Sequence, residues 1–331
     1  MDFSDKQRQL LRLLADGQFH SGSALAVQLG ISRSAVWKHT QSFSALGLEV
    51  MAISGKGYRL EAPLSLLAVD ALKAELTPFT QSKLGAVEIF EQCDSTNNYL
   101  MSEARQGRVA SKVCLAEYQA AGKGRRGRQW VAPFGQNIML SILWRFELGT
   151  SAIAGLSLAI GVAVIRALNK QGIAGVGLKW PNDIFWQDRK LGGILIEVVG
   201  ETSGPCAVVV GLGLNGFLPA KAAGDINQAW VDLRQITGQT TLNRNHLSAA
   251  LLNALIPVLA EFEHTALLDY LQEWRGYDCM LNKTVTVLLH NQTLSGMVKG
   301  INDQGLLLLQ DPQDKLQAFA SGEISFNTQP T

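Results

Sequence analysis

Hydrophobic residues at helical spacing open the chain in three short groups. Leucines over residues 5–15 predict a first helix, and a second helix over residues 23–29 ends at Gly30, a residue suited to a tight turn. A third helix over residues 33–46 repeats its apolar side chains every three or four positions. Two short strands joined by a Gly-Lys-Gly turn at residues 55–57 follow. This order predicts a helix-turn-helix with a β-hairpin wing.

The outer face of the third predicted helix is polar and basic. In helix-turn-helix proteins this helix lies in the major groove, and cations on the wing contact backbone phosphate. Residues 1–60 hold seven Lys or Arg against four Asp or Glu, a mild positive balance. We expect a DNA-binding domain over residues 1–62, bounded by Pro63; a winged helix used for protein contacts remains the alternative. The expected DNA contacts are Ser32, Arg33, Ser34, Trp37, Lys38 and Lys56.

Strands and helices then alternate across residues 63–276, which predicts a mixed α/β domain. We expect Pro257 to break one of the later helices, because proline removes a backbone donor. The expected strands cover residues 87–90, 113–116, 138–144, 176–180, 184–186, 191–199 and 208–215, and the expected helices cover residues 68–76, 99–107, 153–172, 247–262 and 267–275.

From residue 285 the apolar period changes to two. Four or five short strands separated by polar turns follow within about fifty residues. This pattern predicts a small SH3-like β-barrel over residues 277–331. The fold class expected for the whole chain is therefore α+β and multidomain: a winged helix, a mixed α/β domain and a small barrel.

Composition narrows the setting of the protein. Apolar residues make up 47% of the 331 residues and charged residues 17%, which is ordinary for a soluble globular protein. The net charge is +1, so any affinity for nucleic acid must come from local patches. The four cysteines are far apart, the histidines are scattered, and the N-terminus lacks the apolar core of a signal peptide. We expect a cytoplasmic protein with no metal site and no membrane span.

The most unusual stretch is residues 122–128, which hold three glycines and four cations with no acid and no apolar side chain. Such a loop is mobile when free, and its cations require an anion such as a phosphate. Gly122-x-Gly124-x-x-Gly127 formally matches a dinucleotide fingerprint, but Pro133 and Gly135 oppose the helix which that motif demands. The Ser or Thr of a Walker loop is also missing. A solvated basic surface loop is the remaining alternative.

Three other stretches suggest a pocket. Residues 94–98 are five small polar residues at an expected strand-to-helix junction, where they either cap the helix or hold a ligand. Lys179 alternates with apolar neighbours and precedes a Pro-Asn-Asp turn at residues 181–183, so it is a candidate for neutralising a ligand's charge. Gly211 and Gly213 alternate in a strand, which indicates close approach of another group to the backbone.

Taken together and in this order behind a winged helix, these motifs resemble those of the bacterial bifunctional biotin–protein ligases that also repress the biotin operon. The resemblance covers essentially the whole chain, and the basic glycine loop combined with Lys-Trp-Pro-Asn-Asp is very specific. The motifs that carry it are Asp94-Ser95-Thr96-Asn97, Glu117-Tyr118-Gln119, residues 122–128, Lys179-Trp180-Pro181-Asn182-Asp183 and Gly211-Leu212-Gly213-Leu214-Asn215.

The resemblance implies that biotin and ATP, with Mg²⁺, give biotinyl-5′-adenylate and pyrophosphate. Biotin is then transferred to a lysine of a biotin carboxyl carrier domain, without a covalent enzyme intermediate. Lys179 and Arg125 are the implied catalytic residues. Carried over by position, the implied biotin contacts are Ser95, Thr96, Asn97, Gln119, Lys123, Gly124, Arg125 and Lys179, and the implied adenylate contacts are Arg126, Arg128, Asn215 and Trp230.

It also implies that the adenylate-bound protein forms a homodimer that binds operator DNA. One residue departs from the family pattern, because Lys123 stands where arginine is usual and lacks its planar pair of donors. We therefore expect a looser hold on the adenylate. Two other functions remain open: a biotin-sensing transcriptional regulator without transfer activity, and a ligase that uses lipoate.

Overall fold

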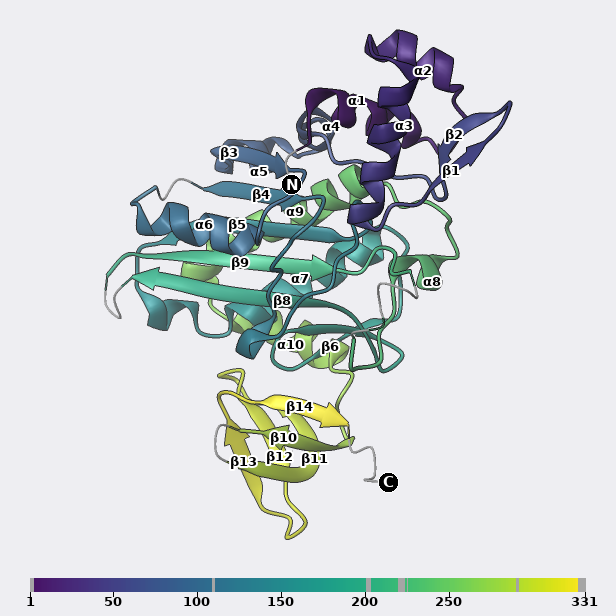
Figure 1. Ribbon diagram of the computed structural model, residues 1–331. Helices are drawn as coiled ribbons and strands as arrows, with labels where there is room; N and C mark the ends of the chain where they lie inside the picture. Colours follow the sequence, from purple (N-terminus) through teal and green to yellow (C-terminus); the bar gives the residue numbers. More distant parts are fainter. Residues whose placement is uncertain are drawn as a thin grey trace.

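The computed structural model describes residues 3–108, 111–200, 204–219, 224, 226–289 and 292–326. Three parts follow one another along the chain (Figure 1): a small helical domain with a wing, a central domain built on a long sheet, and a β-domain at the C-terminal end. The arrangement agrees with the α+β organisation expected from the sequence.

The N-terminal domain is a winged helix-turn-helix, as the apolar spacing predicts. Serine hydroxyls cap its three helices, and Gly30 ends the second in the left-handed region, at φ 64°. A short 3-10 turn replaces the end of the third expected helix. The elements are α1 (Asp5–Leu14), α2 (Gly22–Leu29), α3 (Arg33–Ser42), the 3-10 turn (Phe43–Leu46), β1 (Val50–Ile53) and β2 (Gly57–Leu60).

In the described part of the chain, a seven-stranded sheet in the order β3-β4-β5-β9-β8-β7-β6 forms the central domain. β3 and β4 run parallel, and the pairs β4-β5, β5-β9, β9-β8, β8-β7 and β7-β6 run antiparallel. All the expected strands are present. They are β3 (Ala86–Phe90), β4 (Lys112–Ala116), β5 (Ile138–Phe146), β6 (Val176–Lys179), β7 (Asp183–Trp186), β8 (Arg189–Gly200) and β9 (Cys206–Leu214).

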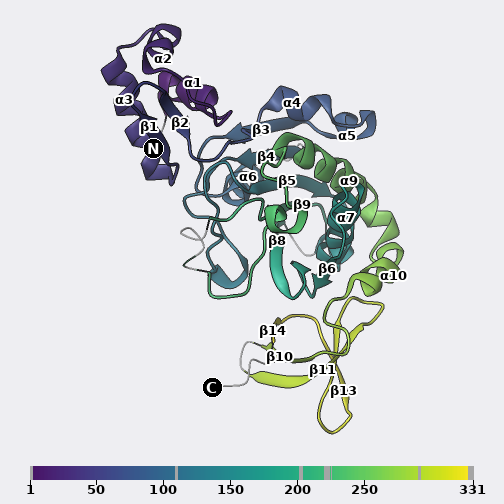
Figure 2. The ribbon, with the colours of Figure 1, turned by 90° about the vertical axis from the view of Figure 1, so that its right-hand side faces the viewer.

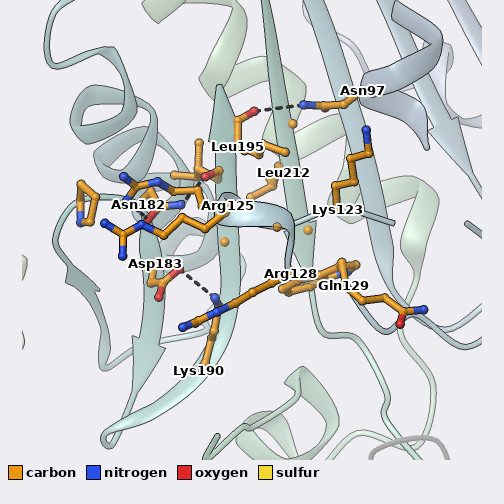
Figure 3. Close-up of a pocket in the computed structure, with 18 of the residues that line it drawn as sticks. Asn97, Lys123, Arg125, Arg128, Gln129, Asn182, Asp183, Lys190, Leu195 and Leu212 are labelled. Atoms are coloured by element: carbon orange, nitrogen blue, oxygen red, sulfur yellow. Dashed lines mark hydrogen bonds and ion pairs between the residues drawn. The ribbon is translucent and has the colours of Figure 1, made fainter. Parts of the chain in front are cut away.

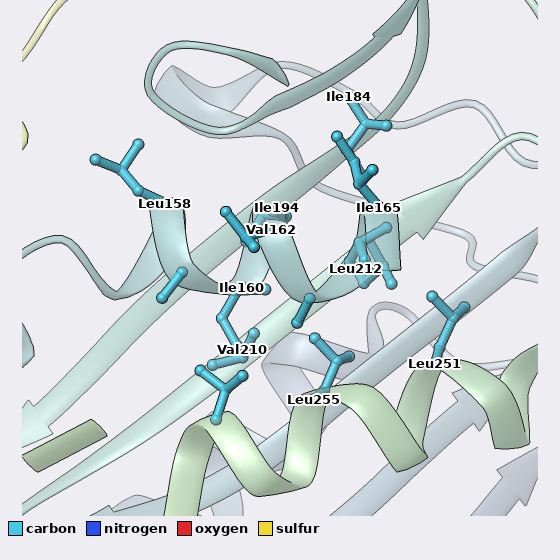
Figure 4. Packing of buried hydrophobic residues seen from close by; sticks show 14 of the residues in the cluster. Leu158, Ile160, Val162, Ile165, Ile184, Ile194, Val210, Leu212, Leu251 and Leu255 are labelled. Atoms are coloured by element: carbon cyan, nitrogen blue, oxygen red, sulfur yellow. The ribbon is translucent and has the colours of Figure 1, made fainter. Parts of the chain in front are cut away.

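Helices cover the two faces of this sheet unequally (Figure 2). α7 (Leu156–Lys170), α9 (Arg244–Thr265) and α10 (Leu268–Tyr277) lie on one face, and α6 (Thr96–Arg105) lies on the other. Aliphatic side chains of α7 and α9 pack against β8 and β9 in the core (Figure 4). Because α6 covers only part of its face, the remainder is available for a pocket.

Four helices differ from the expectation. α5 (Pro78–Lys83) forms where the sequence predicts a loop, because Thr77 caps it and Pro78 occupies the first turn, where no donor is needed. α9 continues through Pro257, so the predicted break was wrong; buried residues on both sides of the proline hold the helix against the core. α8 (Leu233–Thr237) is too short to show a period, and α4 (Val69–Ala74) is shorter than predicted.

The C-terminal domain is an antiparallel sheet in the order β13-β12-β11-β10-β14, and in the described residues no ladder joins β13 to β14. The closed SH3-like barrel is therefore not confirmed. Its buried residues, including Val285 and Leu307, are part of a hydrophobic cluster that continues into the central domain. The strands are β10 (Thr284–Leu288), β11 (Thr293–Ile301), β12 (Leu307–Gln310), β13 (Leu316–Phe319) and β14 (Glu323–Phe326).

By length and composition alone, two segments of the described chain could cross a membrane: residues 150–170 and 244–265. The buried shares of their apolar windows are 61% and 56%. They contain α7 and α9, which pack on each other and on the sheet. This burial is typical of core helices in a globular domain.

Candidate active site

A pocket opens on the α6 face of the central sheet (Figure 3). The pairing register places alternate residues of β5, β8 and β9 on this face, and the segment Gly322–Ile324 of the C-terminal domain contributes to the rim. Ten of the residues expected to bind biotin or adenylate line the pocket: Ser95, Thr96, Asn97, Gln119, Lys123, Gly124, Arg125, Arg126, Arg128 and Lys179. The fold thus brings together residues that are as far apart in the sequence as Ser95 and Lys179.

One end of the pocket is a buried network of neutral polar groups. Ser95 caps α6, as expected, which leaves Thr96 and Asn97 in its first turn. The backbone N–H of Thr96 donates to Gln119 Oε1 over 2.7 Å, and the Thr96 hydroxyl lies 3.0 Å from the same oxygen. Ser141 of β5, which the sequence analysis missed, lies 2.7 Å from Thr96 Oγ1 and 2.6 Å from Asn97 Oδ1.

The alternating glycines of β9 make room for two large groups, which confirms the prediction of close approach. A Cβ on Gly211 would overlap the side-chain amide of Asn97. A Cβ on Gly213 would lie 2.6 Å from Cε2 of Trp130. The strand therefore accommodates the polar end of the pocket at Gly211 and an aromatic wall at Gly213.

The other end of the pocket is cationic. Lys179 is 8% exposed, with Nζ 4.8 Å from the centre of the Phe185 ring, and Arg125 Nη1 donates to Asn182 Oδ1 over 3.2 Å. Burial lowers the pKa of the Lys179 amine and of the Arg125 guanidinium, although nearby Asp183 opposes the effect. An anion entering this end would stabilise both charges.

Lys190 adds a further cation at the same end, which the sequence analysis did not select. Its Nζ forms an ion pair with Asp183 at 2.9 Å and lies 5.9 Å from the Trp130 ring. Asp183 and Glu323 are the acids among the described lining residues, and each already has a basic partner. In the described part of the chain no group of three or more His, Cys, Asp or Glu is placed to hold a metal ion.

The basic loop, residues 122–128, contacts the start of α6 and the C-terminal domain. Lys123 Nζ donates to Asn98 Oδ1 over 2.8 Å. Arg126 has φ 55°, a left-handed conformation that is costly for arginine, and its guanidinium donates to the Leu288 carbonyl over 3.3 Å. Arg128 pairs with Glu323 of the C-terminal domain. The loop itself has no acid, so this neutralising carboxylate comes from a distant part of the chain.

Two expected adenylate contacts do not line this pocket. Asn215 is buried, and its side-chain amide donates to the Val231 carbonyl over 3.0 Å, a structural role. Trp230 is half-buried and pairs through its backbone with Lys190. Trp130 lines the pocket, as does Trp180. The buried Nε1 of Trp130 has no acceptor among the described residues, whereas that of Trp180 donates to the Gly305 carbonyl. The position of Trp130 directly after the basic loop was the available signal.

The expected DNA contacts are all exposed on the N-terminal domain, at α3 and on the wing. Ser32 caps α3, and its hydroxyl lies 2.9 Å from that of Ser34. Arg33 and Lys38 are exposed, and Trp37 is 56% exposed, which is unusual for so large an apolar side chain. Lys56 of the wing lies over the Phe19 ring at 5.8 Å. These exposed contacts include both basic and aromatic side chains.

Comparisons with known proteins match all three parts of the chain. Residues 89–215 match the Biotin/lipoate A/B protein ligase family, residues 280–327 the Biotin protein ligase C terminal domain, and residues 6–59 an HTH domain. The bifunctional ligase/repressor BirA of Salmonella typhimurium is 40% identical over 319 residues, which cover 96% of this chain and 97% of that protein. The chain belongs to the BirA family of bifunctional ligase/repressors.

Two further proteins resemble this BirA-family chain over a shorter span. The biotin–[acetyl-CoA-carboxylase] ligase of Paracoccus denitrificans is 30% identical, over 70% of this chain and 97% of its own length. The solved biotin protein ligase from Aquifex aeolicus in complex with biotin and ATP superimposes with a TM-score of 0.61 at 23% identity, covering 73% of this chain and 98% of that one. The structural likeness supports the fold.

Proposed function

We propose that this BirA-family chain joins biotin to ATP, forming biotinyl-5′-adenylate and pyrophosphate, and then transfers biotin to a lysine of a biotin carboxyl carrier domain. One observation carries the proposal: a single pocket holds a neutral hydrogen-bonding end, with Thr96 and Gln119, and a cationic end, with Lys179 and Arg125. The ureido ring of biotin is neutral and needs both donors and acceptors. Its carboxylate and the triphosphate repel each other, so they require cations before they can meet.

Lys179 and Arg125 are the proposed catalytic residues. When the biotin carboxylate attacks the α-phosphorus, negative charge builds on the phosphoryl oxygens and pyrophosphate leaves. Burial lowers the pKa of both cationic side chains and so disfavours their charged forms. A bound anion beside them stabilises the charged forms again. Ser95, Asn97, Lys123 and Gly124 complete the biotin end, and Arg126 and Arg128 supply positive charge beside the phosphate.

Trp130 and Lys190 are the proposed contacts for the nucleotide beyond its phosphates. The Trp130 ring lines the pocket, and its buried indole N–H needs an acceptor that a nucleotide can supply. Mg²⁺ accompanies ATP in this proposal and is held chiefly by phosphate oxygens, because Asp183 and Glu323 already pair with cations. Asn215 and Trp230 act from behind this wall by supporting the segment around Lys190.

The enzymatic proposal is tested by incubating the full chain with labelled biotin, ATP, Mg²⁺ and a biotin carboxyl carrier domain. We expect label on one carrier lysine and release of AMP and pyrophosphate. Stable adenylate without labelled carrier would favour a biotin-sensing regulator, and labelling only with lipoate would favour the lipoate enzyme. Lys179→Gln should abolish adenylate formation while biotin binding is largely retained.

We further propose that the adenylate-bound protein is a homodimer that represses transcription from a two-fold operator. The ends of the basic loop support this coupling, because Phe134 and Tyr118 pack in the core of the N-terminal domain and Phe134 contacts Phe3 edge-on at 6.0 Å. Arg8 of α1 also pairs with Glu91 of the central domain at 2.7 Å. A loop ordered by adenylate would thereby fix the DNA-binding domain against the central one.

The DNA contacts are tested separately from catalysis. Arg33→Ala and Lys56→Ala should each weaken operator binding, and Lys56→Ala should flatten its dependence on salt, because one phosphate contact is lost. Adenylate synthesis should be unchanged in both variants. A parallel fall in synthesis would show that the two activities are not separable in this way.

The proposal also includes a cytoplasmic location, no membrane partner and an SH3-like class for the C-terminal sheet.

A further inference from the structure

Hydrogen-bond direction at the polar end of the pocket is determined by a residue outside its lining. Asn97 Nδ2 lies 2.9 Å from Glu197 Oε2 and 3.3 Å from the Leu195 carbonyl. A carboxylate and a carbonyl only accept, so the atom facing both must be the amide nitrogen. The Asn97 amide therefore has one allowed orientation, with Oδ1 toward Ser141.

The orientation of Asn97 commits the next hydroxyl in the network. Asn97 Oδ1 can only accept, so the Ser141 hydroxyl donates its single proton to that oxygen over 2.6 Å. Ser141 is fully buried and its oxygen lies 2.7 Å from Thr96 Oγ1. Since Ser141 has no second proton, Thr96 must donate inward, either to Ser141 or to Gln119 Oε1. The Thr96 oxygen thus faces the pocket as an acceptor.

Gln119 has the complementary polarity. Its Oε1 accepts from the backbone N–H of Thr96, so its Nε2 is turned away from Thr96. The Nε2 atom lies beside Gly122, where it would be 3.1 Å from an added Cβ. The polar end therefore offers one fixed acceptor, Thr96, and one fixed donor, Gln119. A ureido group matches this pair with an adjacent N–H and C=O, whereas a dithiolane ring, as in lipoate, has neither.

We propose that Glu197 is a positioning residue for recognition of the ureido ring, acting through Asn97 and Ser141 to keep Thr96 an acceptor. This inference rests on the proposed placement of biotin at Thr96 and Gln119. With a glutamine at position 197, only the longer contact to the Leu195 carbonyl, at 3.3 Å, still opposes a turned amide, because the glutamine N–H can donate to Asn97 Oδ1. The Asn97 amide can then turn over and donate to Ser141. Ser141 then donates to Thr96 and competes with the ligand N–H for the Thr96 oxygen.

The test is a double-mutant cycle in the full chain between Glu197→Gln and Thr96→Val, with biotin affinity measured by calorimetry. Loss of one such hydrogen bond weakens binding by about tenfold. We expect each single variant to bind biotin about tenfold more weakly and the double variant to bind no more weakly than Thr96→Val alone. The KM for ATP should stay within about twofold of the parent in Glu197→Gln, which a general loss of structure would not produce. Glu147→Gln, an exposed partner of Arg145, is the matched control.

The outcomes separate this inference from the placement of biotin. If Thr96→Val leaves biotin affinity unchanged, the placement and the inference both fail. If Thr96→Val weakens binding but Glu197→Gln does not, or if the two losses simply add, the placement stands and the role of Glu197 is refuted. Equal rises in KM for biotin and ATP in Glu197→Gln would also refute it.

Discussion

Gly211 and Gly213 lie two positions apart on β9, yet each opens a different half of the pocket. Replacing Gly213 by alanine places a Cβ 2.6 Å from Cε2 and 2.8 Å from Cζ2 of Trp130. Replacing Gly211 directs the same atom into the Asn97 amide. We predict that Gly213→Ala impairs use of ATP and that Gly211→Ala impairs binding of biotin.

The size of the effect follows from the overlap. Carbon atoms pack at about 3.5–4.0 Å, so the Trp130 ring must retreat by about 1 Å in Gly213→Ala. Overpacking of this kind costs about 1–3 kcal/mol, and here it displaces the wall against which the nucleotide packs. If this cost falls on nucleotide binding, we expect the KM for ATP to rise by about five- to 150-fold. The buried network around Thr96 includes Ser141 and Asn97, which lie beside Gly211 rather than Gly213, so it should be little affected.

The KM values for ATP and for biotin are measured from steady-state release of pyrophosphate, with one substrate varied while the other is saturating. Gly276→Ala is the control, because a Cβ at that helical position meets nothing within 4 Å. Thermal unfolding should show that all three variants remain folded at the assay temperature. The reasoning is refuted if Gly213→Ala raises the KM for biotin as much as the KM for ATP, or if the two variants exchange effects.

Three further predictions concern the loop and the link to the C-terminal domain. Glu323→Gln removes the carboxylate that pairs with Arg128, so trypsin should cut residues 122–128 faster in the ligand-free protein; an unchanged rate contradicts the role of that pair. Lys123→Arg restores a two-pronged donor and should slow release of the adenylate, and equal release rates would dismiss the idea of a looser hold. Burial raises the pKa of Asp278 from 3.8 to about 6, which favours its neutral form in the folded state, so the native protein loses stability as pH rises through this window. Asp278→Asn should therefore stabilise the protein by about 3 kcal/mol at pH 8 and progressively less toward pH 4, as measured by denaturant unfolding, and a pH-independent gain would exclude this cause.

Local patterns were sufficient for most of the fold. Each strand of the central sheet is a short apolar run, and the caps and the Gly30 turn of the N-terminal domain are local signals. Pro257 misled because a helix buried along its length can tolerate a lost backbone bond. The closure of the C-terminal sheet could not be predicted, because an alternating apolar pattern shows that one face of each strand is buried but not whether the sheet closes on itself.

The site was predictable where its residues carry motifs and not where it depends on long-range contacts. Glu323 meets the basic loop from nearly 200 residues away, and Ser141 sits in a strand that otherwise reads as apolar. The resemblance pointed to Trp230 as an adenylate contact, but Trp130 lines the pocket and Trp230 does not, because the fold determines which ring reaches it. Glu197 could not be predicted from the sequence either, because its contact with Asn97 depends on how α6 crosses β8.

Protection of the basic loop by its reaction product tests most directly whether that loop closes on biotinyl-adenylate. Trypsin should cut at Lys123, Arg125, Arg126 and Arg128 in the free protein and much more slowly after biotin and ATP have been added together. Either substrate alone should protect less than both. Cleavage within residues 122–128 at the same rate with and without the two substrates would contradict a loop ordered by the adenylate, and with it the proposed link between catalysis and repression.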